Sequence, residues 1–182
     1  MLNTVIHGDC LEKLKQIESN SIDAIVTDPP YLHIKGGNKD WGGIKYTFKG
    51  GHRYNDTYIN TDMSDFAENE IFNFLNTAKT KLKKMNMMVF CSELQLQYYF
   101  KWINSNNFKY NLLVWDKGNR VIMNRNRYMS NFEYIIRIYE SGISLKSNEN
   151  NMLYCKLKNY KADKVKLHNT QKPTQLIEDL IL

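Results

Sequence analysis

The fold of this chain is decided by one stretch, Ile22-Asp23-Ala24-Ile25-Val26-Thr27-Asp28-Pro29-Pro30-Tyr31. Its first half is a short apolar run of the kind that forms a buried strand. Two consecutive prolines cannot continue a central strand or lie inside a helix, so the chain has to turn there. The turn leaves a carboxylate and an aromatic ring at the carboxyl end of a strand, where open α/β sheets place their ligands. The sequence therefore predicts an active site at residues 28–31, with a plain proline-rich turn as the simpler alternative.

The residues before this stretch predict a strand and a helix. Residues 4–7 have the character of a short strand. Asp9, with Glu12 three residues later, is typical of a capping box at the start of a helix that ends near residues 19–21. Strand, helix and strand then follow with the crossover length that a parallel sheet needs.

The same alternation continues to the end of the chain, so the sequence predicts a single α/β domain over residues 1–182. Pro173 is placed to open the last helix at its first turn. Strands are expected at residues 87–91, 110–115 and 132–139, and helices at residues 64–82, 93–103 and from 173 onwards.

Two segments lack this periodicity, residues 32–61 and residues 140–167. The first is a long loop that interleaves glycines with cations and aromatic rings, a mixture that suits a nucleic-acid backbone and unstacked bases. A surface segment without a ligand is the alternative, and a solvated basic face is the alternative for the later arginines. The candidate nucleic-acid-binding residues are Lys35, Lys39, Trp41, Lys45, Lys49, Arg53, Arg120, Arg125 and Arg127.

Composition narrows the class of protein. The net charge of +6 is compatible with a polyanionic partner without requiring one. No apolar run approaches the length of a membrane span, and the N-terminus lacks the features of a secretory signal. The three cysteines and four histidines show no metal-ligand spacing. We therefore expect a cytoplasmic protein with reduced thiols, no metal site and no membrane association.

Five motifs occur in an order that resembles the permuted β class of S-adenosyl-L-methionine-dependent DNA amino-methyltransferases. The two specific ones are DPPY at residues 28–31 and HNTQKPT at residues 168–174. The weaker similarities are HGDCL at residues 7–11, VWDKGN at residues 114–119 and NFEYI at residues 131–135. The resemblance covers nearly the whole chain and implies a Rossmann-like methyltransferase sheet with helices on both faces.

The resemblance implies transfer of a methyl group from S-adenosyl-L-methionine to the exocyclic amino group of adenine in double-stranded DNA. The family's habit links an aspartate in the first position of DPPY with adenine, and a serine with cytosine. The Asp28 carboxylate and the Pro29 carbonyl are placed to accept the two N–H bonds of the amine, and Tyr31 to stack on an extruded base. The catalytic residues are then Asp28, Pro29, Pro30 and Tyr31.

The same resemblance implies a set of cofactor-binding residues. For Asp9 the alternative is a plain helix cap, and for His168 and Lys172 it is a position on the surface before a helix. The implied set is Asp9, Cys10, Asp28, His168, Lys172, Pro173 and Thr174.

The chain departs from the family pattern at its end. The family's glycine-rich strand-turn follows the last motif, and this sequence stops at Leu182 before it. We therefore expect an incomplete or truncated methyltransferase, with completion by a partner as an alternative. The setting expected is restriction-modification or phage, residues 140–167 are the candidate target-recognition segment, and a homodimer is possible.

Three other functions stay open at this point. One is a non-catalytic DNA-binding remnant of such an enzyme. The others are a cytosine amino-methyltransferase and a methyltransferase that acts on RNA or protein amides.

Overall fold

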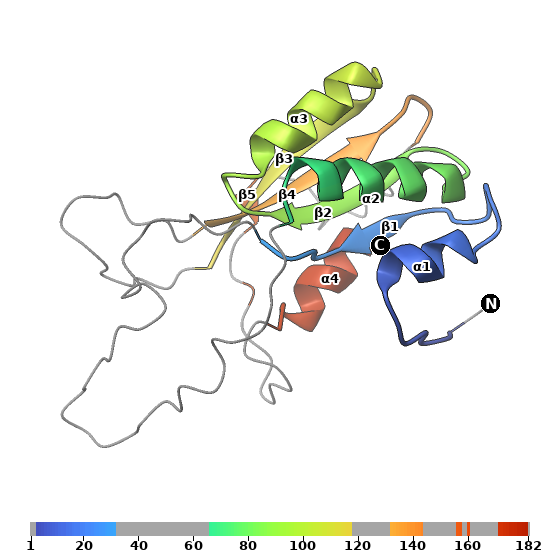
Figure 1. Ribbon diagram of the computed structural model, residues 1–182. Helices are drawn as coiled ribbons and strands as arrows, with labels where there is room; N and C mark the ends of the chain where they lie inside the picture. Colours follow the sequence, from blue (N-terminus) through green and yellow to red (C-terminus); the bar gives the residue numbers. More distant parts are fainter. Residues whose placement is uncertain are drawn as a thin grey trace, which may run out of the picture.

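The computed structural model describes residues 3–31, 66–117, 132–143, 156–157, 160 and 171–181 (Figure 1). Within these ranges, five strands form one mixed sheet in the order β1-β2-β4-β3-β5. The strands are β1 (Ile25–Thr27), β2 (Asn86–Cys91), β3 (Lys109–Asp116), β4 (Phe132–Tyr139) and β5 (Lys156–Leu157). The helices are α1 (Cys10–Lys15), α2 (Glu68–Lys81), α3 (Leu96–Ser105) and α4 (Thr174–Ile181). The α/β class that the sequence predicted is confirmed.

The register of the strands brings four strand ends to one edge of the sheet. β1 and β2 pair in parallel, and β4 runs antiparallel to both β2 and β3. Cys91, at the carboxyl end of β2, lies opposite Tyr134, and Asp116, at the carboxyl end of β3, lies opposite Phe132. The carboxyl ends of β1, β2 and β3 and the amino end of β4 therefore meet at one edge, which we call the carboxyl edge.

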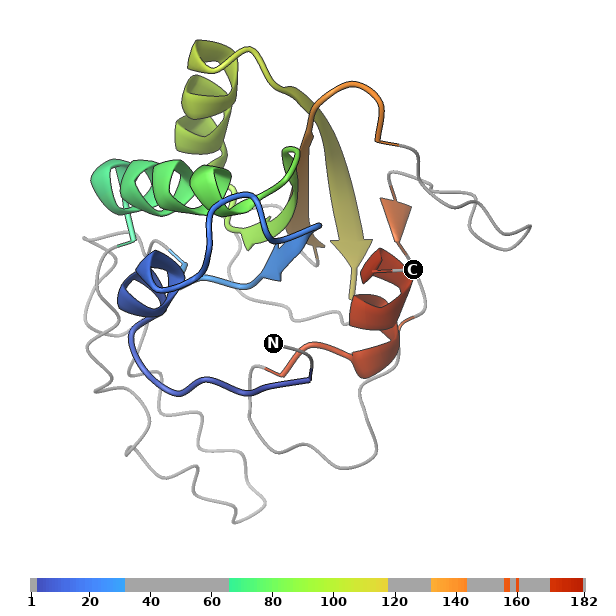
Figure 2. The ribbon, with the colours of Figure 1, turned by 90° about the vertical axis from the view of Figure 1, so that its right-hand side faces the viewer.

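Helices cover both faces of this sheet (Figure 2). Helices α1, α2 and α3 pack on one face, and α4 packs on the other. The cluster on the α4 face, which we call the α4 core, consists of Met88, Phe90, Leu113, Trp115, Ile135, Leu176 and Leu180. The opposite cluster is larger, and Trp102 and Tyr99 of α3 are almost fully buried in it. These burial patterns follow from side-chain alternation on the strands and from the apolar stripes of the helices.

Most of the predicted elements are confirmed, and β4 has the predicted bounds of residues 132–139. The strands at residues 87–91 and 110–115 are β2 and β3, each extended by one or more residues. Helix α2 begins at Glu68 in the described part of the chain, and Pro173 directly precedes α4. None of the helices in the described ranges combines the length and the apolar character that a membrane crossing requires.

The predicted strand at residues 4–7 is wrong. These residues are irregular, and the Val5 and Ile6 side chains are 97% and 45% exposed. A strand is stable only when its backbone groups are paired with a neighbour. No strand among the described residues pairs with this segment, so its apolar pattern has no sheet to join.

The predicted cap of the following helix is half confirmed. The Asp9 carboxylate accepts a hydrogen bond from the Glu12 backbone N–H at 3.0 Å, as an N-cap does. The Glu12 side chain, however, pairs with Lys15 at 2.6 Å instead of returning to the cap. A lysine three residues along the same helix face competes for that carboxylate, so the capping box is incomplete.

Candidate active site

Strand alternation aims the key carboxylates at one face of the sheet. Val26 and Ile135 both contact the α4 core. Side chains two positions apart on an extended chain share a face. Asp28 follows Val26 by two residues and Glu133 precedes Ile135 by two, so both lie at the carboxyl edge on the α4 face, where Lys172 enters just before α4.

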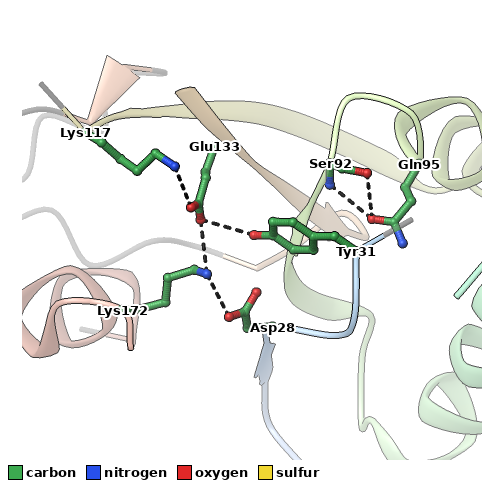
Figure 3. Close-up of polar contacts among 7 residues, drawn as sticks. All are labelled: Asp28, Tyr31, Ser92, Gln95, Lys117, Glu133 and Lys172. Carbon is green, nitrogen blue, oxygen red and sulfur yellow. Dashed lines mark hydrogen bonds and ion pairs between the residues drawn. The ribbon is translucent and has the colours of Figure 1, made fainter. Parts of the chain in front are cut away.

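Lys172 lies between these two carboxylates (Figure 3). Its Nζ is 2.8 Å from Asp28 Oδ2 and 3.1 Å from Glu133 Oε2. Lys117, which follows β3, places its Nζ 2.9 Å from Glu133 Oε1. The side chains of Lys172 and Glu133 are only 11% and 16% exposed, whereas that of Asp28 is 36% exposed. The structure thus brings four charged groups together, and Asp28 is the more exposed of the two carboxylates that Lys172 links.

Two aromatic rings flank the Lys172 ammonium. Its Nζ lies 5.3 Å from the ring centroids of both Tyr31 and Phe90, within the range of a cation–π contact. The Tyr31 hydroxyl donates a hydrogen bond to Glu133 Oε2 at 3.1 Å. The Tyr31 ring therefore stands beside the charge cluster, with its hydroxyl held by Glu133 and one face toward Lys172.

The environment shifts the pKa values of two of these groups. Burial, followed by the negative charges of Asp28 and Glu133, raises the pKa of Tyr31 far above its ordinary value, so the phenol keeps its proton. Burial is also the largest single influence on Glu133 and favours its neutral form. The hydrogen bond from Lys117 and the charges of Lys172 and Lys117 together outweigh it, and the pKa of Glu133 lies below its ordinary value.

The structure brings together the residues predicted to be catalytic and, besides Asp28, one more of those predicted to hold a cofactor. Asp28, Pro29, Pro30 and Tyr31 follow β1 at the carboxyl edge, and Lys172 joins them through its ion pair with Asp28. Pro173 is buried and Thr174 is exposed at the start of α4.

The other predicted residues fall in two groups. Asp9 and Cys10 are exposed at the start of α1, and within the described ranges neither forms a hydrogen bond or an ion pair with Asp28. His168 and all nine predicted nucleic-acid-binding residues lie outside the described residues.

Sequence reasoning missed three residues of this site. Glu133 and Lys117 lay inside weakly similar motifs and were not singled out, although both pair directly with site residues. Gln95, fully buried near Ser92, bonds to the backbone of the turn at Pro30. The sequence did carry a signal for Glu133 and Lys117, because each is a charged residue at the end of a predicted buried strand. A partly buried charge needs an oppositely charged partner, so both could have been predicted to form ion pairs.

The groups at the carboxyl edge fit the chemistry of a sulfonium-bearing amino-acid cofactor. Asp28 and Glu133 supply negative charge, Lys172 supplies positive charge for a carboxylate, and Tyr31 offers an aromatic face. Among the described residues, no group of three or more His, Cys, Asp or Glu side chains is placed to hold a metal ion.

Comparison with known proteins bears on the fold of the chain. No protein-family model matches the chain. A segment of 31 residues, 17% of this chain, is 61% identical to the type II methyltransferase M.HinfI of Haemophilus influenzae, and it spans only 9% of that protein. The fold is similar to the crystal structure of the M1.HpyAVI–SAM complex, with a TM-score of 0.56 and 22% identity, over 97% of this chain and 74% of that one. It is also similar to the PvuII DNA methyltransferase (cytosine-N4-specific), with a TM-score of 0.62 and 15% identity, over 96% and 67%.

These likenesses confirm the resemblance and the Rossmann-like methyltransferase fold that the motifs predicted. At such identities they establish the fold alone.

Proposed function

We propose that this chain is the catalytic part of an S-adenosyl-L-methionine-dependent DNA methyltransferase that modifies the exocyclic amino group of adenine. The observation that carries the proposal is the Asp28–Tyr31 turn at the carboxyl edge, where a partly exposed carboxylate stands beside an aromatic ring. The fold of the chain is similar to that of the PvuII DNA methyltransferase.

The residues of the turn suit an exocyclic amine. Such a nitrogen is a poor nucleophile because its lone pair is delocalised into the base. The Asp28 carboxylate and the Pro29 carbonyl accept hydrogen bonds from its two N–H groups, which localises the lone pair on nitrogen. Lys172 occupies Asp28 Oδ2, and a carboxylate has acceptor capacity on both oxygens, so the ion pair and the substrate bond are compatible.

The bound cofactor supplies an electrophilic methyl group at its sulfonium sulfur. The proposed cofactor contacts are Asp9, Cys10 and Asp28, the residues Lys172, Pro173 and Thr174 around the start of α4, and His168. The chain's own contribution is alignment and a fixed electrostatic environment, the two effects that dominate such transfers. The proton released by the nitrogen passes to Asp28 and on to water, since this side chain is 36% exposed.

Adenine and duplex DNA belong to the same proposal. Asp28 at the first position of the motif favours adenine, while the PvuII neighbour is described as cytosine-N4-specific. Extrusion of the base costs a few kcal/mol, and stacking on Tyr31 returns about 1–3 kcal/mol of it. The basic residues of segments 32–61 and 120–127 are the proposed phosphate contacts, and residues 140–167 the proposed target-recognition segment. A single catalytic domain, a cytoplasmic location and a restriction-modification role complete the proposal.

The test is methyl transfer from labelled S-adenosyl-L-methionine to duplex DNA, with the product nucleosides separated. We expect N6-methyladenine, and we expect Asp28→Ala to lower kcat by at least about 100-fold, because it removes the acceptor. The matched control is Asp23→Ala, at the other end of β1, where an 82% exposed carboxylate pairs, among the described residues, with Lys83 on the surface. This control keeps the rate of the native chain.

Other outcomes would reject the proposal or part of it. Full activity in Asp28→Ala contradicts the mechanism, and N4-methylcytosine as the product contradicts the choice of base. Salt-sensitive DNA binding without calorimetric binding of S-adenosyl-L-methionine identifies a non-catalytic remnant. Transfer to RNA or to a protein amide in parallel reactions replaces DNA as the substrate.

A further inference from the structure

One buried amide joins three segments of the chain beside the Asp28–Tyr31 turn. The Gln95 side chain is 0% exposed and lies directly before α3. Its Oε1 accepts hydrogen bonds from the Ser92 backbone N–H at 3.1 Å and from Ser92 Oγ at 3.0 Å (Figure 3). Its Nε2 donates to the backbone carbonyls of Pro30 at 3.0 Å and of Phe66 at 2.8 Å. The end of β2, the turn and the start of α2 are thereby tied to one side chain.

This amide has no spare hydrogen-bonding capacity. A carboxamide carries two N–H donors and an oxygen with two lone pairs, and each of these four has a partner. A buried polar group left without its partner is costly. The position of the Pro30 carbonyl is therefore fixed by a bond that the surrounding structure strongly favours.

The sequence of the turn explains why an outside donor is needed. Pro29 and Pro30 have no backbone N–H, so two consecutive residues cannot anchor the turn by donating. The turn can be held there only through its carbonyls, and Gln95 Nε2 supplies a donor to one of them. The Pro30 carbonyl and the Tyr31 N–H belong to the same planar peptide unit. The direction of the carbonyl therefore sets the position of the Tyr31 backbone, from which the ring projects.

We propose that Gln95 is a positioning residue for the Asp28–Tyr31 turn, acting through the Pro30 carbonyl. The inference rests on the proposed function for its kinetic consequence, because Gln95 itself does not touch the reacting groups. It fixes the turn whose Asp28 carboxylate, Pro29 carbonyl and Tyr31 ring bind the base. A displacement of about 1 Å at such a site costs about 100-fold in rate.

The kinetic experiment compares two substitutions at Gln95 with a matched control in the 182-residue chain. Gln95→Met fills the space without donors, and we expect kcat to fall about 10- to 100-fold while KM for DNA changes less. The control is Gln97→Glu, at an exposed residue whose Nε2 donates to the carbonyl of its neighbour Leu94 at 3.1 Å. This control keeps the kcat of the native chain.

The variant Gln95→Glu adds a pH signature that general damage to the fold does not produce. An ionised carboxylate at this position cannot donate to either carbonyl, so kcat is low at neutral pH. Burial beside carbonyl oxygens raises the pKa of the new carboxyl group. Below that pKa the neutral acid donates one bond, so its kcat relative to the native chain recovers as the pH falls. Gln95→Met shows no recovery.

A readout without catalysis separates this inference from the proposed function. In protein with ¹³C-labelled tyrosine rings, the Tyr31 resonance is identified from its loss in Tyr31→Phe. We expect it to move in Gln95→Met and to stay in place in Gln97→Glu. If the native chain transfers no methyl group, the proposed function fails, and a moved Tyr31 resonance still supports the positioning role. The positioning role is overturned if the Tyr31 resonance of folded Gln95→Met does not move, or if this variant keeps the native kcat.

A milder variant keeps the inference testable if substitutions at Gln95 do not fold. Ser92→Ala removes the hydroxyl donor to Oε1 and keeps the backbone donor. We expect a folded protein with a kcat about threefold lower and a displaced Tyr31 resonance, since one of four bonds that hold the amide is lost. If Ser92→Ala keeps both the native kcat and the native resonance, Gln95 does not position the turn.

Discussion

At the scale of single residues, Lys172 is where the charges of the site converge. An ammonium group that is only 11% exposed needs compensation, because moving a charge out of water costs several kcal/mol. Asp28 and Glu133 provide it, and Lys117 balances the second negative charge. The four groups are neutral together, so removing one of them leaves an unpaired charge in a partly buried place.

Glu133→Gln tests this balance. The amide keeps the shape of the side chain and loses its charge, so we expect the free energy of unfolding at neutral pH to fall by about 1–3 kcal/mol. In the native chain the pKa of Glu133 is below its ordinary value of 4.5, so its stabilising contribution is complete above 4.5 and is lost as the pH falls through the lowered value. Urea unfolding at neutral pH and at about pH 3 therefore shows a gap between native chain and variant that shrinks in acid.

The matched control for this measurement is Glu12→Gln. Glu12 also pairs with a lysine, but its side chain is 64% exposed, and such pairs contribute little. Equal effects of the two substitutions, or a gap that stays constant in acid, would contradict the assignment of Glu133 as the buried carboxylate of the cluster.

Sequence motifs were enough to single out Asp28, Tyr31 and Lys172 as candidates, because each lies in a short pattern with its own chemistry. They did not identify the partners that hold these residues. Tyr31 bonds to a residue 102 positions away, and the Pro30 carbonyl bonds to one 65 positions away. No local pattern encodes such a pair, since it exists only after the strands have been placed in order.

At the scale of elements, buried strands and amphipathic helices were predictable, and the exposed segment at residues 4–7 was not. Strand β4 was expected with its actual bounds because its sequence is rich in isoleucine and aromatic residues. In the structure the side chains of residues 135–138 are buried, and all of them except Arg137 are apolar. Residues 4–7 have a similar apolar character, but a strand requires a paired neighbour as well as a pattern. Pairing is a property of the sheet and cannot be seen in four residues.

Helix α2 offers a prediction about its amino end. Its N-cap is Ala67, in extended conformation, which accepts no bond through its side chain, while Glu70 Oε2 already accepts the Ala67 backbone N–H at 3.3 Å. Ala67→Ser supplies the missing acceptor for a first-turn N–H and completes a capping box. We expect the free energy of unfolding to rise by about 0.5–2 kcal/mol, measured by urea unfolding.

Ala67→Val serves as the control for this substitution, because it adds volume at the same half-buried position without an acceptor. A valine variant as stable as the serine variant would show that side-chain volume, and not capping, accounts for any gain.

At the scale of the whole molecule, the two faces of the sheet differ in their relation to the site. The larger core on the face of α1, α2 and α3 supports the fold, whereas the α4 core also fixes the segment that carries Lys172. Leu176 of α4 and Leu75 of α2 are both 0% exposed, one in each core. The same leucine-to-alanine substitution on the two faces should therefore affect the site differently.

Leu176→Ala and Leu75→Ala make this comparison. Each removes the same atoms from a fully buried position, so each lowers the free energy of unfolding by about 2–5 kcal/mol. Only Leu176→Ala loosens α4 four residues from Lys172, and with it the ion pairs to Asp28 and Glu133. Assayed at a temperature where both variants are folded, Leu176→Ala should lose most of its methylation rate and Leu75→Ala little of it. Leu176→Met, which conserves volume, should restore the rate. An equal loss of rate in both alanine variants would mean that α4 fills the core without placing Lys172.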